Sequence, residues 1–467
     1  MNFVKGYYPL LLAGIILLLK KIPDISLPFY WDEAWSYGNT ITYLAHNSLN
    51  SVFSNPHLLK GHPSLFYLFF STIASIFNNN IFILHIVAFL ISILTIVGVY
   101  KLVITISEKK TAIIAVSLFM VQGVFVAQST FVLPDMAMTC CTIFAFFYFY
   151  KKKFWATALL LTANTLIKET GIITAFALAI IYLIENAGKH PQKLLTPKML
   201  YFAIPAFALM LHFLSNKILF NWFIYPDHSN LMHFSIEYLT STAYNYLNFL
   251  MIKQFRWILF FLILLFLGLL YKKLKYKNEL MQWGIFIVTY ILFMSFNFST
   301  LRYSLSILPF YTSIFAILVV QIVKQTQYLN LITGILVLLF AFLNNNSKKL
   351  GDESESYQQM VKVHQQTIMY CQQTFNPDIQ IYSHFLVNHY ISNNRLGYLS
   401  PQLNGFEGFK NLSPELSSST QIVIISSIEQ NNAFDKLEKN SNFHIVKTFT
   451  NKNAWCKIYQ KKKLKEK

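Results

Sequence analysis

Residues 7–37 read YYPLLLAGIILLLKKIPDISLPFYWDEAWSY, an apolar run followed by two adjacent carboxylates, Asp32 and Glu33, among aromatic side chains. Such a run is typical of a membrane helix, and aromatic residues gather where a helix leaves the lipid. Acidic side chains at that depth are unfavourable to desolvate, which makes them candidates for a functional site. The stretch therefore predicts a membrane helix that leads into a site at the membrane surface.

The composition extends this interpretation to most of the chain. Of the 467 residues, 55% are hydrophobic and 12% are charged, whereas an ordinary soluble domain has about 25% charged residues. Apolar runs recur as far as residue 344, and roughly 20 apolar residues are enough for a helix to cross a hydrocarbon core of about 30 Å. The sequence therefore predicts an all-α polytopic membrane protein.

The positive charge is distributed as in a membrane protein and not as in a protein that binds nucleic acid. Lys and Arg number 38 against 20 Asp and Glu, but the lysines cluster between apolar runs, as in cytoplasmic loops. If these clusters are all cytoplasmic, the chain crosses about 11 times, with its amino terminus inside and its carboxyl terminus outside. Residues 63–77 are short for a full crossing and are predicted to form a helix that lies in the outer interface or dips partway into the membrane. The clusters lie at 109–110, 151–153, 189–198, 272–277 and 324.

Two interpretations of the amino terminus are open. Lys5 before an apolar run resembles a signal peptide. Lys20, Lys21 and Pro23 follow the run without a cleavage site of small residues, so we expect an uncleaved first helix.

The chain changes character near residue 345. Short β-branched runs, TQIVIISS and FHIVKTF, alternate with a helical stretch beyond that point. Such alternation is typical of a small α/β domain. We therefore divide the chain into a transmembrane domain, 1–344, and an extracytoplasmic α/β domain, 345–467.

The notable polar residues of the membrane domain fall on one predicted side. Surface loops need polar residues in any protein, and this explanation suffices for the four residues between 227 and 237. It is weaker for Asp32 and Glu33, because their aromatic neighbours place them at headgroup depth. Acids and bases that converge on one membrane face predict a site there. The full set is Asp32, Glu33, His62, Asp135, Lys168, Glu169, Asp227, His228, His233, Glu237 and Arg302.

Five short motifs stand out among these residues. They are WDEAWSYG with Asp32 and Glu33, GHPSLFYLFF with His62 and Pro63, FVLPDMAMT with Asp135, TLIKETG with Lys168, and LRYSLSILPF with Arg302, Tyr303 and Pro309. Their order over about residues 1–325 resembles membrane glycosyltransferases of the GT-C type. The branch is that of the protein O-mannosyltransferases and lipid A aminoarabinose transferases, families 39 and 83. Each motif alone is a weak signal, but all five fall on the predicted outer side.

The resemblance implies transfer of a sugar from a polyprenyl-phosphate donor to a hydroxyl of a protein, lipid or glycan, with inversion. Asp32 matches the family's general base, which takes the acceptor's proton, and Glu33 supports it. Arg302 first, and Lys168 second, would stabilise the leaving lipid phosphate. Asp135 matches a second catalytic acid that shapes the acceptor site or orients the first loop.

The resemblance also implies the surroundings of the site. His62, Pro63 and Tyr303 would shape it, and the partners would be the donor, the acceptor and membrane lipids, without nucleic acid. We expect a bacterial inner membrane protein whose site and carboxyl terminus are extracytoplasmic. No cofactor is expected. A divalent metal is possible because Asp, Glu and His occur together, but the sequence has no HExxH or CxxC spacing, so we expect none to be required.

Two other classes of protein stay open. A transporter carries ionisable residues near the bilayer midplane and is often built from inverted repeats or broken helices. Here the acids gather at one face and glycine is scarce, 15 residues in 467. A non-catalytic assembly protein on the same fold is the second alternative, and the intact acids at 32, 33 and 135 disfavour it. Release of free polyprenyl phosphate would distinguish the enzyme from both.

Overall fold

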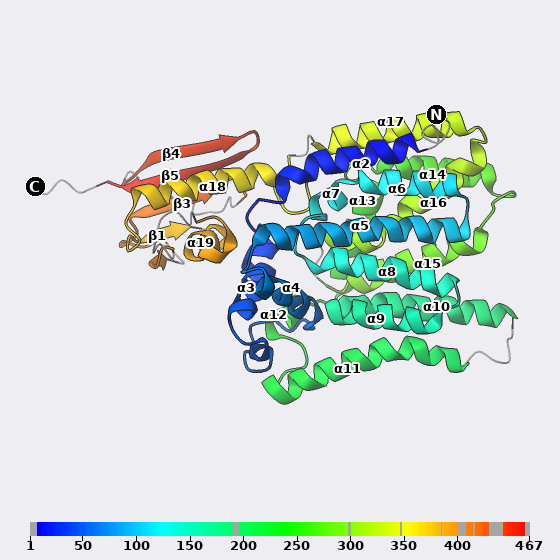
Figure 1. The fold of residues 1–467 in the computed structure, drawn as a ribbon, viewed down its shortest axis with the longest axis horizontal. Coiled ribbons are helices and arrows are strands. Elements are labelled where there is room, and N and C mark those ends of the chain that lie inside the picture. Colours follow the sequence, from blue (N-terminus) through cyan, green and yellow to red (C-terminus); the bar gives the residue numbers. More distant parts are fainter. Residues whose placement is uncertain are drawn as a thin grey trace, which may run out of the picture.

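The structure, a computed structural model, describes residues 7–189, 196–297, 300–345, 348–383, 385–399, 408–413, 416–428 and 442–462. Figure 1 shows a bundle of long helices lying side by side and a smaller sheet domain at one end of it. We call that end of the bundle the domain end. The predicted architecture, an all-α membrane part with a small C-terminal α/β domain, is confirmed. Lys193, predicted to be cytoplasmic, lies outside the described residues.

The bundle is built mainly from apolar helices. Its longer helices are α2 (Tyr8–Lys21), α5 (Ile81–Ile106), α6 (Lys109–Met120), α8 (Pro134–Tyr150), α9 (Phe154–Ile167), α10 (Ile172–Lys189), α11 (Leu200–Phe220), α13 (Ile236–Met251), α14 (Trp257–Leu270), α15 (Lys277–Met294), α16 (Leu308–Ile322) and α17 (Thr326–Asn345). Short helices complete it: α3 (Asn39–His46), α4 (Leu65–Ile76), α7 (Gly123–Gln128) and α12 (Pro226–Ser229).

The described helices differ in their capacity to cross a membrane. By length and composition alone, the structure has four candidates among the described residues: Ile81–Ile106, Glu169–Ala187, Pro197–Phe220 and Thr326–Asn344. Turns shorten others, as between α6 and α7 or between α13 and α14. The estimate of about 11 crossings therefore stays a prediction that depends on the lysine pattern.

Close packing joins neighbouring helices of the bundle. α8 packs against both α5 and α9. Gly98 on α5 makes this approach possible, since a Cβ there would lie 2.9 Å from Phe144 on α8. Small residues allow membrane helices to approach closely, and the gain in dispersion replaces the hydrophobic effect that lipid cannot supply. The bundle therefore offers a rigid frame for the loops at its domain end.

The first loop and two short helices cover the domain end. α3 and α4 pack on each other there, and α12 lies beside them (Figure 1). The stretch 63–77 forms α4, a single helix of 12 residues at this end. The stretch that follows α11 is partly helical, because Thr242, Tyr246 and Phe249 are buried at helical spacing in α13.

Over its described residues, the C-terminal domain is a mixed sheet with two helices. The sheet has the order β2-β1-β3-β5-β4, with β1 parallel to β2 and β3, and β5 antiparallel to β3 and β4. The predicted run TQIVIISS forms β3, which is buried throughout, and FHIVKTF forms β4. The elements are α18 (Tyr357–Thr374), β1 (Ile381–Ser383), α19 (Phe385–Ser392), β2 (Leu412–Ser413), β3 (Ile422–Ser426), β4 (Phe443–Asn451) and β5 (Ala454–Lys461).

Candidate active site

Arg302 is the centre of a cluster of charges at the domain end. It lies in the 3₁₀ turn η6 (Leu301–Ser306) between α15 and α16, and its side chain is 4% exposed. Its guanidinium contacts Asp32 through Nη2 and Asp352 through Nη1, and its Nε lies 3.3 Å from Asp135 Oδ2. A planar guanidinium presents five donors in a fixed fork, so one arginine can hold several carboxylates. Three residues predicted for the site, from distant parts of the sequence, are thus brought together.

The backbone around Asp32 is unusual. Trp31 has a left-handed φ of 56°, and the π-helical turn η2 (Glu33–Gly38) follows Asp32. Such geometry is uncommon and gathers at functional sites. Trp35 Nε1 donates a hydrogen bond of 2.8 Å to Asp32 Oδ1. Burial alone would raise the pKa of Asp32, but the Arg302 guanidinium and the Trp35 N–H hold it below its usual range. Asp32 is therefore ionised at neutral pH and can accept a proton.

Lys168 links Asp135 to the next motif. Asp135 lies in the first turn of α8, and Lys168 follows the last residue of α9 in an extended conformation. Its Nζ lies 3.7 Å from Asp135 Oδ1 and 3.8 Å from the ring centroid of Tyr303. Burial alone would lower the pKa of Lys168, but Tyr303 and Asp135 raise it above its ordinary value. The cation is therefore permanent, and its charge is only partly balanced by Asp135.

A second acid–base pair adjoins Lys168. His62 Nδ1 lies 2.9 Å from Glu169 Oε2, and the rings of Tyr37 and His228 lie 6.1 and 4.7 Å from the His62 ring. Burial, and then His62, lower the pKa of His228 to about 4. His62, followed by the buried Pro63, thus joins the loop before α4 to the turn after α9.

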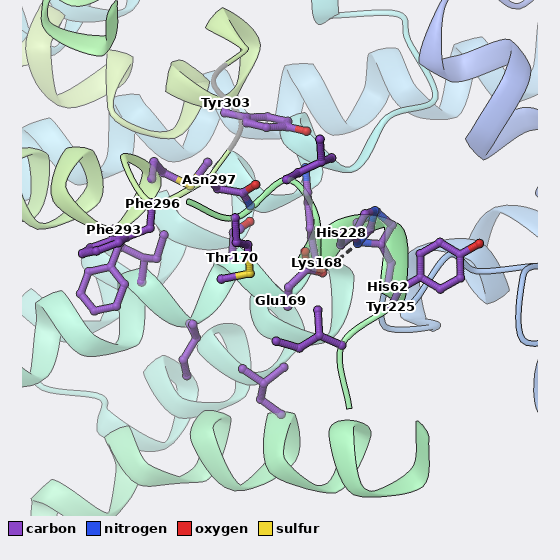
Figure 2. Close-up of a pocket in the computed structure, with 18 of the residues that line it drawn as sticks. His62, Lys168, Glu169, Thr170, Tyr225, His228, Phe293, Phe296, Asn297 and Tyr303 are labelled. Atoms are coloured by element: carbon purple, nitrogen blue, oxygen red, sulfur yellow. Dashed lines mark hydrogen bonds and ion pairs between the residues drawn. The ribbon is translucent and has the colours of Figure 1, made fainter. Parts of the chain in front are cut away.

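A cavity of about 300 Å³ lies beside Lys168. Figure 2 shows Lys168, Glu169, His62 and His228 gathered at one part of it, whereas Phe293 and Phe296 line another. Among the described residues, Lys168 lines this cavity, whereas Arg302 does not. The apolar side chains of its wall include Ile172, Ile173, Leu209, Phe213, Phe293 and Met294, from α10, α11 and α15.

Glu33 occupies a different position from its neighbour Asp32. It is fully buried, and its Oε1 lies 3.0 Å from His85 Nε2 and accepts a hydrogen bond of 2.6 Å from the Val132 amide. Its Oε2 accepts a hydrogen bond from the Tyr30 amide. These partners fix the first loop to α5 and to the chain before α8. Glu33 therefore holds the loop through these contacts, and its supporting role in catalysis stays a prediction.

The segment 350–358, which we call the strap, is the main feature that sequence reasoning missed. It connects α17 to the C-terminal domain and lies across the domain end of the bundle, where Asp352 becomes the third carboxylate on Arg302. The acidic run GDESES at 351–356 is the feature of the sequence that could have indicated this segment. Its further contacts are Glu355 to Lys20, Tyr357 and Gln358 to Asp24, and the Leu350 carbonyl to the Tyr30 hydroxyl.

Lys60 is a second residue that the motifs did not include. It stands one position before the GHP motif, and its Nζ lies 3.2 Å from the ring centroid of Trp35, whose indole binds Asp32. Burial lowers its pKa to about 8, against the opposing effect of Asp32. Lys60 thus adds a cation near Asp32, with the Trp35 ring between them.

Asp352 predicts a dependence of stability on pH. Burial, and then the charge of Asp32, raise its pKa to about 7 although Arg302 lowers it. A raised folded-state pKa stabilises the protein fully below the unfolded value near 4, and this contribution is lost as the pH rises through about 7. We expect thermal melting of the purified protein to show this fall between about pH 4 and 7. Asp352→Asn should flatten the profile, whereas the exposed Asp227→Asn should not. Parallel profiles for all three proteins would contradict the assignment.

A metal site would need several ligand side chains close together. Over the described ranges, no three His, Cys, Asp or Glu side chains are grouped so that they could hold a metal ion. The expectation that none is required stays a prediction, and chelator treatment of the active protein tests it.

Comparisons with known proteins address the fold and the family. A family model described as dolichyl-phosphate-mannose-protein mannosyltransferase matches residues 61–215, which include His62, Asp135 and Lys168. No curated protein matches the sequence. ArnT from Cupriavidus metallidurans bound to undecaprenyl phosphate is 10% identical, with a TM-score of 0.60 over 97% of each chain. Its apo state gives a TM-score of 0.58.

A third solved structure extends the comparison. Archaeal oligosaccharyltransferase AglB from Archaeoglobus fulgidus, in complex with an inhibitory peptide and a dolichol-phosphate, is 12% identical, with a TM-score of 0.50. The alignment covers 91% of this chain and 70% of that one. At such identities the likeness establishes the fold, and the family match supports it independently over about a third of the chain. The predicted resemblance is confirmed: this chain is an integral membrane protein with the fold of the GT-C glycosyltransferases.

Proposed function

We propose that the protein transfers a sugar from a polyprenyl-phosphate donor to a hydroxyl acceptor on the extracytoplasmic face of the bacterial inner membrane. One observation carries this proposal. An amphipathic cavity has a buried lysine, Lys168, at its polar end, and the ionised Asp32 is joined to Lys168 through Asp135 and Arg302. A cavity with apolar walls and a fixed cation fits a lipid that carries a phosphate.

The chemistry proposed is a single displacement at the anomeric carbon. The acceptor oxygen forms a bond to that carbon while its proton passes to Asp32. The bond between the anomeric carbon and the phosphate oxygen breaks, and the polyprenyl phosphate leaves with the electron pair. Lys168 faces the leaving phosphate and stabilises its charge, so Lys168 has the main role at the phosphate and Arg302 the lesser one. Arg302 holds Asp32 and Asp135 in position, and one displacement inverts the configuration.

Donor binding tests the role of Lys168. Lys168→Ala should weaken binding of polyprenyl phosphate by about 10- to 100-fold, since a hydrogen bond to a charged group is worth about 1.5–3 kcal/mol. The matched control is Lys217→Ala, because Lys217 is an exposed lysine of α11 near the same end. Titration of the detergent-purified proteins with polyprenyl phosphate gives both affinities. Equal affinities for wild type and Lys168→Ala would exclude this donor site.

The side of the membrane is a separate prediction. Single cysteines at the exposed positions Ser54 and Asn230, both at the domain end, should react with an impermeant reagent in intact cells. Cysteines at Lys109 and Lys152, exposed near the opposite helix ends, should react only after permeabilisation, because lysine-rich loops stay in the cytoplasm. The reverse pattern would place the site on the cytoplasmic face.

The alternative of a transporter receives no comparable support. The charged residues of the candidate site gather at the domain end and pair with one another, whereas a transport pathway needs a site near the midplane. A non-catalytic protein would have no need of an ionised carboxylate beside a buried lysine. Turnover of the donor distinguishes the three classes.

A further inference from the structure

The η6 turn that carries Arg302 separates two cavities. Tyr303 lines the cavity that we assign to the donor, and Leu301, two residues earlier, lines another of about 420 Å³. This second cavity lies under the strap, between the end of α17 and the turn that joins α13 to α14. The proposed reaction makes no use of it.

The second cavity is lined by more cationic than anionic side chains. Lys253, Lys348 and Lys349 line it together with Glu353 and Glu355. Glu355 is paired with Lys20 outside the lining. Glu353 accepts hydrogen bonds of 2.9 and 2.6 Å from the Thr300 hydroxyl and the Leu301 amide. Across the described ranges, neither Lys253 nor Lys348 has a carboxylate within ion-pair distance. The positive charges of Lys253 and Lys348 are therefore not balanced by a carboxylate, and the lining favours an anion.

The turn that forms one wall is fixed by specific contacts. Gln254 and Phe255 both have left-handed backbone, with φ of 51° and 63°. Residues with a Cβ rarely adopt this conformation, and where they do, it often belongs to a ligand clamp. The Gln254 amide holds the turn, because it accepts from the Val124 N–H at 3.2 Å and donates to the Glu353 carbonyl at 3.1 Å.

A buried arginine increases the positive potential beside this turn. Arg256 is fully buried and has no carboxylate partner among the described residues. Its donors reach only the Phe249 carbonyl and the side chains of Gln122 and Gln254. A buried cation without a counter-ion is unfavourable unless an anion approaches it.

Exposed aromatic side chains stand beside the cavity. Phe255 and Trp257, at its wall and just beyond, are 37% and 53% exposed, as aromatic residues are in the interfacial belt of a membrane protein. Two of its lining residues, Leu301 and Leu343, are apolar, and Leu343 lies in the last turn of an apolar helix. The position therefore offers lysines to a headgroup and apolar side chains to the adjoining part of a lipid.

We propose that this cavity binds the phosphate of an anionic membrane lipid. Lys253 and Lys348 contact the phosphate, and Phe255 and Leu343 pack against the glycerol and the first methylenes. The site is distinct from the donor cavity, which has its own cation, Lys168, on the other side of η6. The proposal concerns binding and does not depend on the proposed reaction.

The test uses full-length protein in nanodiscs or vesicles made from phosphatidylcholine with increasing amounts of phosphatidylglycerol. Wild type should retain phosphatidylglycerol selectively, as measured by native mass spectrometry and by titration with a fluorescent phosphatidylglycerol. Lys253→Ala with Lys348→Ala should weaken this binding about 30-fold, from two lysines of ordinary strength at an anionic membrane surface. The matched control is the pair Lys272→Ala and Lys273→Ala, two exposed lysines after α14, which should bind like wild type.

Three results would overturn the proposal. The double variant could bind phosphatidylglycerol as wild type does, or wild type could bind phosphatidylcholine equally well. Inorganic phosphate at equal concentration could displace the labelled lipid, which would make the ligand a free anion. Lys168→Ala serves as a further comparison, because it should leave phosphatidylglycerol binding unchanged, and a loss there would mean that the lipid occupies the donor cavity.

Discussion

Asp32→Asn should lower the rate of sugar transfer by a factor of about 10²–10⁴, which is the usual contribution of a general base. Asparagine keeps the size of the side chain and can accept the hydrogen bond from Trp35, but it cannot take the acceptor's proton. Folding should change little, since Arg302 retains Asp135 and Asp352 as partners. The measurement is the rate of transfer from a polyprenyl-phosphate donor by detergent-purified protein, with thermal melting as the test of folding.

Two neighbouring carboxylates serve as comparisons for Asp32. Asp227→Asn, at an exposed position of the same end, should turn over normally. Glu33→Gln should lower the melting temperature more than Asp32→Asn does, because it disturbs three buried contacts to His85, Val132 and Tyr30. If Asp32→Asn retained near-normal turnover, the base would have to be another group.

Arg302→Ala should abolish transfer and destabilise the protein by about 3–5 kcal/mol, the usual effect of removing one partner from a buried ion pair. The loss leaves Asp32, Asp135 and Asp352 close together without the cation that they share. Arg302→Lys should recover only part of both properties, because a single ammonium cannot occupy three directions at once. Unfolding in denaturant and sugar transfer give the two readouts.

A second substitution separates the structural from the catalytic part of this effect. Adding Asp352→Asn to Arg302→Ala removes one of the unpaired carboxylates, so it should restore part of the stability. It should not restore transfer, because Asp32 would still lack the group that positions it. If the double variant recovered both stability and transfer, Arg302 would have only a structural role.

Much of the membrane part could be predicted from the sequence. The apolar runs predicted the helices, and the lysine clusters predicted that the acidic and basic residues at the helix ends lie on one side. The structure does bring Asp32, Asp135, Lys168 and Arg302 together. These residues could be grouped from the sequence because successive helices alternate in direction. If the lysine-rich loops lie at one end of the bundle, the loops between them lie at the other. The short helix at 63–77 was predictable from its length alone.

The contributions of distant segments could not be predicted in the same way. Asp352 lies in a run of polar residues that resembles any linker, and only the fold shows that this run lies over Arg302. Glu33 and Asp32 are adjacent in the sequence, but the π-helical turn sends them to different partners, His85 and Arg302. We propose the reverse order for the two cations, because Lys168 lines the cavity, and the sequence alone does not show which side chain faces a cavity.

The most direct test is the fate of the donor. Purified protein in nanodiscs is incubated with a panel of polyprenyl-phosphate sugars and with cell-envelope acceptors, and free polyprenyl phosphate and glycosylated product are both measured by mass spectrometry. We predict that wild type releases polyprenyl phosphate in equal amount to the product with at least one sugar, and that Asp32→Asn releases at most about one hundredth as much. Release by wild type from none of the donors, or equal release by wild type and Asp32→Asn, would contradict the assignment of a glycosyltransferase with its base at Asp32.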